Sequence, residues 1–176
     1  TYYLATKKSD EAIQSLLKKH DLERMKKFEI EPEAGWTRLG LAYEQKGELE
    51  KAVSALKEGL HKAKETGNGV CLRIIFKHLG FCFTTMKDYP QAEEYFEASL
   101  SLARSLNKRN EEMEILHRLG KMYVESRNID QAINIFNEGL DLAKNARNSK
   151  FEGVFLTRIG DVYALTPQKQ EAVKFY

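Results

Sequence analysis

The stretch Leu119-Gly120-Lys121-Met122-Tyr123 decides the fold, because its pattern returns every 40 residues along the chain. The corresponding positions read Leu39-Gly40-Leu41-Ala42-Tyr43, Leu79-Gly80-Phe81-Cys82-Phe83 and Ile159-Gly160-Asp161-Val162-Tyr163. The four glycines align without a gap. A fixed period of this length predicts a repeat architecture, in which each repeat buries its apolar face against the next one.

Two further ladders of residues share this period. One consists of alanines, namely Ala12, Ala52, Ala92, Ala132 and Ala172. The other consists of large apolar residues, namely Leu16, Leu56, Phe96, Phe136 and Tyr176. Within each repeat the apolar residues lie three or four positions apart in two runs, which predicts two helices. Short breaks such as Lys46-Gly47-Glu48 predict the turns between them. The fold class is therefore all-α, a solenoid of antiparallel helix pairs.

The repeats divide the chain into one array with incomplete ends. Residues 33–72, 73–112 and 113–152 are full repeats, while residues 1–32 hold a partial, degenerate repeat and residues 153–176 another partial one. We expect residues 1–176 to form a single array. The chain lacks an initiator Met and stops partway through an expected helix, so we interpret it as a fragment.

The recurring glycine predicts close helix crossings. A glycine inside a helix costs about 1 kcal/mol relative to alanine. Four glycines at one register are expected only where close packing offsets this cost. A larger side chain at Gly120 should therefore overpack the crossing.

Composition excludes several classes of function. The 28 basic and 26 acidic residues leave a net charge of +2, too little to indicate nucleic acid or an anionic membrane as partner. No apolar run approaches the roughly 18 residues of a membrane helix. Cys71 and Cys82 have no CxxC spacing, which suits two packed thiols in a reducing, cytoplasmic setting; a disulfide between them is the less favoured alternative.

The order of residues in the first full repeat resembles the tetratricopeptide repeat, or TPR: Trp36, Leu39, Gly40, Tyr43, Ala52, Leu56 and Gly59. The usual TPR has 34 residues and a proline near its end. Here the period is 40, and that position holds Lys64, Arg104 and Lys144. This longer variant is similar to the repeats of bacterial peptide-pheromone sensors and of the animal Leu-Gly-Asn polarity adaptors. The adaptors' Asn after Leu-Gly is absent here.

The resemblance implies a right-handed superhelix whose concave groove is lined by the first helix of each pair and binds a peptide or a partner helix. Mapped by register, the candidate peptide-binding residues are Thr37, Leu41, Lys77, Phe81, His117, Arg118, Lys121 and Arg158. The implied function is a non-enzymatic protein- or peptide-binding scaffold. Two alternatives stay open: the sensor domain of a peptide-regulated bacterial switch, whose effector lies outside this fragment, and a self-associating spacer.

The most basic part of the expected groove is the cluster Lys77, His78, His117, Arg118 and Lys121, which favours an acidic peptide or a free C-terminus. Beside it, the ladder Arg38, Arg118 and Arg158 is suited to a carboxylate, because arginine offers a planar fork of donors. The alternative is that its arginines pair with Glu44, Glu114 or Asp161 of neighbouring helices. The carboxylate clamp of chaperone-binding TPRs matches at Lys77, but Phe81 and Arg118 stand where that clamp has Asn, so chaperone-tail binding is not favoured.

The chain shows no pattern that indicates catalysis or a metal. His78 and His117 have no Cys, Asp or Glu at ligand spacing beside them, so we expect solvated helix histidines rather than metal ligands or a catalytic base. No phosphate-binding loop and no nucleophile motif is present. We expect no enzyme activity and no cofactor.

Overall fold

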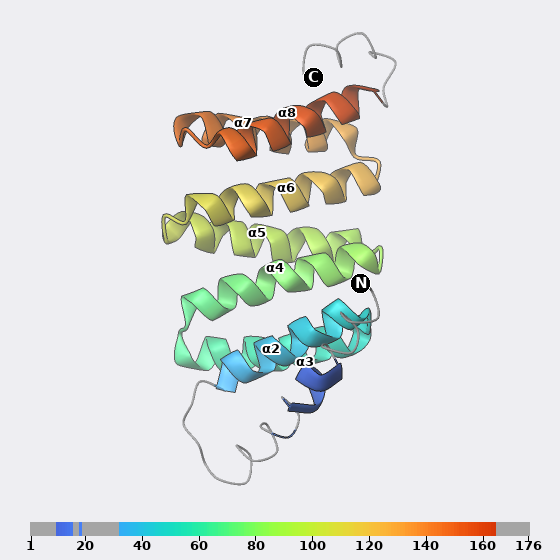
Figure 1. Cartoon of the computed structure of the whole chain (residues 1–176), viewed down its shortest axis with the longest axis vertical. Helices are drawn as coiled ribbons and strands as arrows, with labels where there is room; N and C mark the ends of the chain where they lie inside the picture. The colour runs from blue at the N-terminus through green and yellow to red at the C-terminus, as the bar shows by residue number, and fades with distance from the viewer. Residues whose placement is uncertain (1–9, 16–17, 19–31, 165–176) are drawn as a thin grey trace. The chain divides into compact units, whose positions relative to one another are not determined.

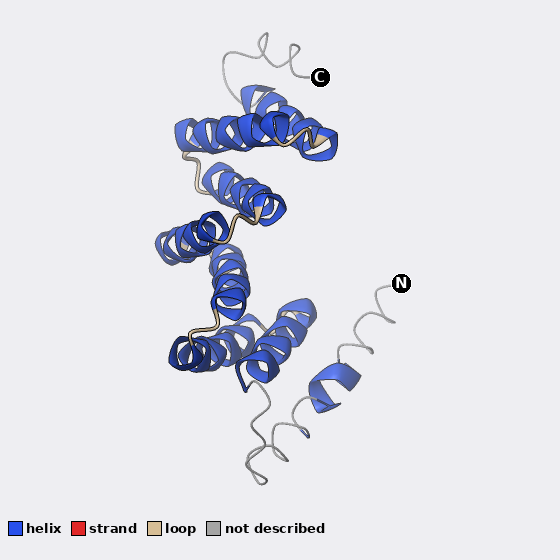
Figure 2. Cartoon of the chain, turned by 90° about the vertical axis from the view of Figure 1, so that its left-hand side faces the viewer, coloured by secondary structure: helices blue, strands red, loops and turns tan. Residues whose placement is uncertain are grey.

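The computed structural model describes residues 10–15, 18 and 32–164, and all the regular structure within these ranges is α-helical (Figure 2). The contacts between Cα atoms divide the chain into two compact units, residues 1–88 and 89–176. The all-α architecture of paired helices expected from the repeats is confirmed.

The first unit contains α2 (Pro32–Lys46), α3 (Leu49–Thr66) and α4 (Gly69–Thr85) (Figure 1). Helix α2 packs against both α3 and α4. Its buried residues Leu39 and Ala42 join Ala55 of α3 and Ile13 of the first described segment in one apolar cluster. That segment is also tied to α2 by an ion pair of 2.7 Å between Asp10 and Lys46.

The second unit contains α5 (Tyr89–Ser105), α6 (Arg109–Glu125), α7 (Ile129–Asn145) and α8 (Ser149–Ala164) (Figure 1). Helix α6 lies at its centre and packs against α5, α7 and α8. The centre of α6 is correspondingly apolar, and its fully buried side chains include Met113, Ile115, Leu116, Leu119 and Met122.

The turns between helices repeat in backbone conformation every 20 residues, once after each helix. One left-handed residue follows each helix from α2 to α7, at Gly47, Gly67, Lys87, Asn107, Arg127 and Arg147. The next N–H donates to the carbonyl of a residue near the helix end, for example Asn128 to Tyr123 at 2.8 Å and Lys108 to Ala103 at 2.8 Å. These bonds satisfy terminal carbonyls of each helix. The first helices α4, α6 and α8 thus begin four residues before the expected repeat boundaries.

The close crossings predicted from the glycines are confirmed. A Cβ atom on Gly40 would lie 2.6 Å from Cγ of Leu56, and one on Gly120 would lie 2.3 Å from Cε1 of Phe136. Gly139, in the second helix, is even tighter, because its Cβ would lie 2.2 Å from Cζ of Phe155. The large apolar ladder therefore occupies the space that the glycines leave open.

Both cysteines lie on α4 as free thiols. Cys82 is buried, and its burial raises the pKa of the thiol to about 12. None of the described helices combines the length and apolarity needed to cross a membrane. In the described part of the chain, no three His, Cys, Asp or Glu side chains gather in a group that could hold a metal ion.

Candidate functional site

The candidate peptide-binding residues all lie on first helices, as their register predicts. Thr37 and Leu41 are on α2, Lys77 and Phe81 on α4, His117, Arg118 and Lys121 on α6, and Arg158 on α8. The structure brings members of the second unit together. Arg158 of α8 contacts His117 of α6, and it lines one hollow with Lys121. Arg118 also lies on α6.

A hollow of about 210 Å³ lies between α6 and α8, and we call it the groove pocket. Its lining consists of Lys121, Val124, Glu125, Phe136, Arg158, Asp161 and Val162. Two of the eight candidate residues, Lys121 and Arg158, thus share one hollow. Apolar side chains from α6, α7 and α8 form the rest of its wall together with two carboxylates.

Phe136 is fully buried on α7 and contributes the aromatic part of the groove pocket. Its ring reaches this position because Gly120 on α6 has no side chain to obstruct it. The glycine ladder, which first identified the fold, therefore also shapes the apolar wall of the pocket. A larger residue at Gly120 would push the ring out of place.

Each arginine of this face pairs with a carboxylate on its own helix. Arg158 Nη1 donates to Asp161 Oδ2 at 3.0 Å, and Arg118 Nη2 donates to Glu114 Oε1 at 3.3 Å. The four side chains are between 33% and 42% exposed. Exposed pairs of this kind contribute at most about 1 kcal/mol. A ligand carboxylate of better geometry could therefore take the place of either one.

Lys121 differs from these arginines. Its side chain is exposed at the groove pocket, and it makes no hydrogen bond or ion pair with any other residue that the structure describes. Its ammonium is therefore a cation that a ligand can approach without breaking an existing pair.

His117 connects α6 to α8. Its Nε2 accepts a hydrogen bond of 3.3 Å from Nε of Arg158, and its ring meets the edge of Phe155 at a centroid distance of 6.4 Å. Because the guanidinium can only donate, this nitrogen carries no proton. Burial lowers the pKa of His117 to about 4, with further lowering by the charges of Arg158, Lys121 and Arg118. The expectation of a solvated histidine is wrong here, since the ring is half-buried and contacts Arg158 and Phe155.

The lowered pKa gives a pH dependence of stability. As pH falls from about 6.5 to 4, the unfolded chain takes up a proton at residue 117 before the folded chain does. His117 should therefore contribute fully to the free energy of unfolding above about pH 6.5. This contribution should be lost as the pH falls from about 6.5 to 4. Urea unfolding of wild type and His117→Gln should show a shallower loss in the variant. Equal losses over this window would contradict the assignment.

His78 and the remaining candidates lie in the first unit. His78 Nδ1 bonds Glu44 Oε2 at 2.7 Å, which links α4 to α2, and both side chains are mostly buried, so this histidine is not solvated either. Thr37 is 6% exposed and donates its hydroxyl to the Glu33 carbonyl at 2.6 Å. Its hydroxyl is thus already used inside α2.

Leu41, Lys77 and Phe81 are half-buried on the surfaces of α2 and α4. The sequence-based mapping by first helices alone omitted Phe136, which it assigned to the second-helix core. The sequence does contain a sign of this position. Glycine at 120 and a large aromatic residue at 136 are the combination expected where a ring passes close to a helix backbone, and the Phe136 ring does lie against Gly120.

Two models of the tetratricopeptide repeat match this sequence, one over residues 71–145 and one over residues 34–60. The chain belongs to the tetratricopeptide repeat family. No curated protein sequence matches it.

Solved TPR structures share the fold at low sequence identity. A Podospora anserina protein with nearly identical TPR-like repeats is 14% identical with a TM-score of 0.79, covering 99% of this chain and 89% of its own. A signal transduction ATPase with a TPR sensor from Pyrococcus horikoshii is 20% identical with a TM-score of 0.80, covering 95% of this chain and 26% of its own. The Rap conjugation gene regulator of plasmid pLS20, solved with the Phr* peptide, is 18% identical with a TM-score of 0.70, covering 99% and 48%.

Proposed function

We propose that this TPR chain is a non-enzymatic interaction module that binds an acidic peptide segment on the face of its first helices. The groove pocket accepts an apolar side chain of the peptide, and a neighbouring carboxylate contacts Lys121. The observation that carries the proposal is the ammonium of Lys121, exposed beside an apolar wall and engaged with no other described residue.

The chemistry of the groove pocket supports this choice of ligand. Val124 is half-buried and offers apolar surface, and the buried Phe136 and Val162 lie behind it. Burial of an apolar side chain against such a wall contributes to the binding energy. Lys121 and Arg158 supply donors for a carboxylate, with Arg158 exchanging its exposed partner Asp161 for the ligand. Charge matching then fixes the orientation of the peptide more than its affinity.

The family and its structural relatives support the general mode of action. TPR arrays are generally non-catalytic scaffolds that bind proteins or peptides, and the Rap regulator was solved with a peptide bound. The proposal includes a cytoplasmic location, which the two free thiols on α4 support.

A charge reversal tests the groove pocket. An array of acidic peptides that contain one apolar residue would first be screened against the wild-type chain. Calorimetry with the tightest binder should then show at least about tenfold weaker binding by Lys121→Glu/Arg158→Glu, because two attractive contacts become repulsive.

The matched control is Lys144→Glu/Lys150→Glu, which makes the same change in net charge at exposed positions outside the groove pocket. It should bind within about twofold of wild type. Equal weakening in both double variants would show a general charge effect and reject the pocket. Undiminished binding by Lys121→Glu/Arg158→Glu would reject it as well.

A second candidate function is the sensor part of a peptide-regulated switch. The similarity to a TPR sensor of a signal transduction ATPase and to the Rap regulator favours it, and this chain spans only 26% and 48% of those two proteins. The sequence that flanks residues 1 and 176 in the full-length gene product is the test. An adjoining ATPase, helix-turn-helix or helical-bundle domain would favour the sensor role over a free-standing scaffold.

A further inference from the structure

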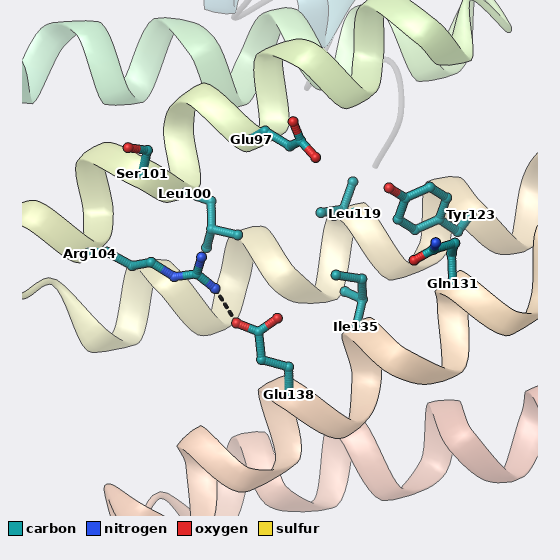
Figure 3. Close-up of a pocket in the computed structure, with 9 residues that line it drawn as sticks. All are labelled: Glu97, Leu100, Ser101, Arg104, Leu119, Tyr123, Gln131, Ile135 and Glu138. Atoms are coloured by element: carbon teal, nitrogen blue, oxygen red, sulfur yellow. Dashed lines mark hydrogen bonds and ion pairs between the residues drawn. The ribbon is translucent and has the colours of Figure 1, made fainter.

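A second hollow lies in the second unit, between α5 and α7 and over α6 (Figure 3). It has a volume of about 380 Å³ and shares no lining residue with the groove pocket. We call it the second-helix pocket, because most of its lining comes from the second helices. The lining consists of Glu97, Leu100, Ser101, Arg104, Leu119, Tyr123, Gln131, Ile135 and Glu138.

The middle of this pocket is apolar. Leu100, Leu119 and Ile135 lie between the two polar ends, as Figure 3 shows. Leu100 and Leu119 are themselves buried in the unit, so they form a fixed wall rather than a loose surface. An extended aliphatic chain could lie along this wall.

One end of the pocket already holds a guanidinium. Arg104 Nε donates to Glu112 at 2.9 Å, and its Nη2 donates to Glu138 across the pocket. Two carboxylates from α6 and α7 thus satisfy this arginine. This end of the pocket is therefore already occupied by a cation, and its carboxylates are matched.

The other end carries negative charge with no cation to match it. Glu97 is exposed on α5 and makes no hydrogen bond or ion pair within the described part of the chain. Beside it, Glu93 accepts a hydrogen bond from the Tyr123 hydroxyl. Burial raises the pKa of Tyr123, and the bond to Glu93 and the charges of Glu93 and Glu97 raise it further, which agrees with a negative potential at this end.

We propose that the second-helix pocket binds one arginine or lysine side chain from a segment of a partner protein. Its methylene groups pack along Leu100, Leu119 and Ile135, and its charged head meets Glu97, with Gln131 as a further polar contact toward the same end (Figure 3). Long basic side chains bury their stems on apolar surface in this way while their heads stay hydrated.

Charge selects this occupant over others. The lining has two carboxylates and one arginine, and Arg104 is already shared between Glu138 and Glu112. An acidic side chain would meet Glu97 with no available cation. A purely apolar side chain would remove water from the Glu97 carboxylate without supplying a cation or a hydrogen bond to offset that cost. The inference does not depend on the groove pocket, so the two faces can be tested separately.

The test uses N-acetyl-arginine methylamide as a probe and N-acetyl-citrulline methylamide as its uncharged isostere. Titration of the isotope-labelled chain, followed by amide NMR shifts, should give saturable changes in α5, α6 and α7 with the arginine probe. The citrulline probe should bind at least about fivefold more weakly, since it lacks the charge.

Two variants localise the effect. Glu97→Gln should weaken the arginine probe at least about fivefold, whereas Glu94→Gln, an exposed glutamate of α5 outside the pocket, should leave it unchanged. Absent shifts, equal binding of the two probes, or equal effects of the two variants would overturn the proposal. Self-association that Glu97→Gln abolishes in sedimentation would assign the pocket to a second copy of this chain and would also overturn it.

Discussion

Gly120→Ala is expected to lower the free energy of unfolding by about 2–3 kcal/mol, although alanine is the better helix former. The added Cβ would lie 2.3 to 2.7 Å from three carbon atoms of the Phe136 ring. A flexible side chain could bend away, but a planar ring that is fully buried has to move as a whole. Urea unfolding followed by circular dichroism measures the change.

Gly153→Ala is the matched control. Gly153 lies inside α8 with nothing within 4 Å of a built Cβ, so alanine there meets open space. Its helix propensity should raise the free energy of unfolding by about 0.5–1 kcal/mol. Both substitutions replace glycine by alanine inside a helix, and their effects on the free energy of unfolding are expected to have opposite signs. If Gly120→Ala were as stable as Gly153→Ala, the close crossing at Gly120 would be wrong.

Phe136→Ala is expected to cost about 3–5 kcal/mol, the largest effect of any substitution considered, because the ring is fully buried and its removal leaves a cavity. Phe151, a half-buried ring that stacks on Phe155 at 6.1 Å, provides the comparison. Phe151→Ala should cost clearly less, since part of its surface is already hydrated. Equal losses would argue against Phe136 as a central packing residue.

Combining the two substitutions tests whether they act on each other. In the Phe136→Ala background, alanine at position 120 no longer meets the ring, so its further cost should shrink or change sign. A double-mutant cycle should therefore give a coupling of at least about 1 kcal/mol between the two positions. Additive effects would mean that the ring and the glycine are independent, contrary to their contact.

The period of the sequence was sufficient to predict the helix pairs, because it does not depend on any one residue. The turns illustrate this. Gly47, Gly67 and Asn107 carry residue types that the left-handed conformation favours, while Lys87, Arg127 and Arg147 adopt it with a long side chain. Residue chemistry alone would have missed these three turns, but each stands one or two 40-residue periods after Gly47 or Gly67, so the period predicts them.

The candidate sites were less predictable, because they depend on how far side chains reach across helices. Register alone placed Lys121 and Arg158 on first helices of successive repeats. It could not show that Arg158 Nε donates a hydrogen bond of 3.3 Å to His117 Nε2. Nor could it show that the Phe136 ring passes Gly120 to reach the groove pocket. The second-helix pocket was not visible at all, since it results from side chains of three helices that the repeat pattern treats as core or solvent.

The most direct test of the proposed function locates a bound peptide on the chain. Hydrogen exchange with mass spectrometry would compare the free chain with its complex with the tightest acidic peptide from the array. The bound peptide should slow amide exchange in α6 and α8, around Lys121 and Arg158. Amide exchange in α5 and α7 should change little. Protection confined to α5 and α7, with α6 and α8 unchanged, would contradict the proposed function.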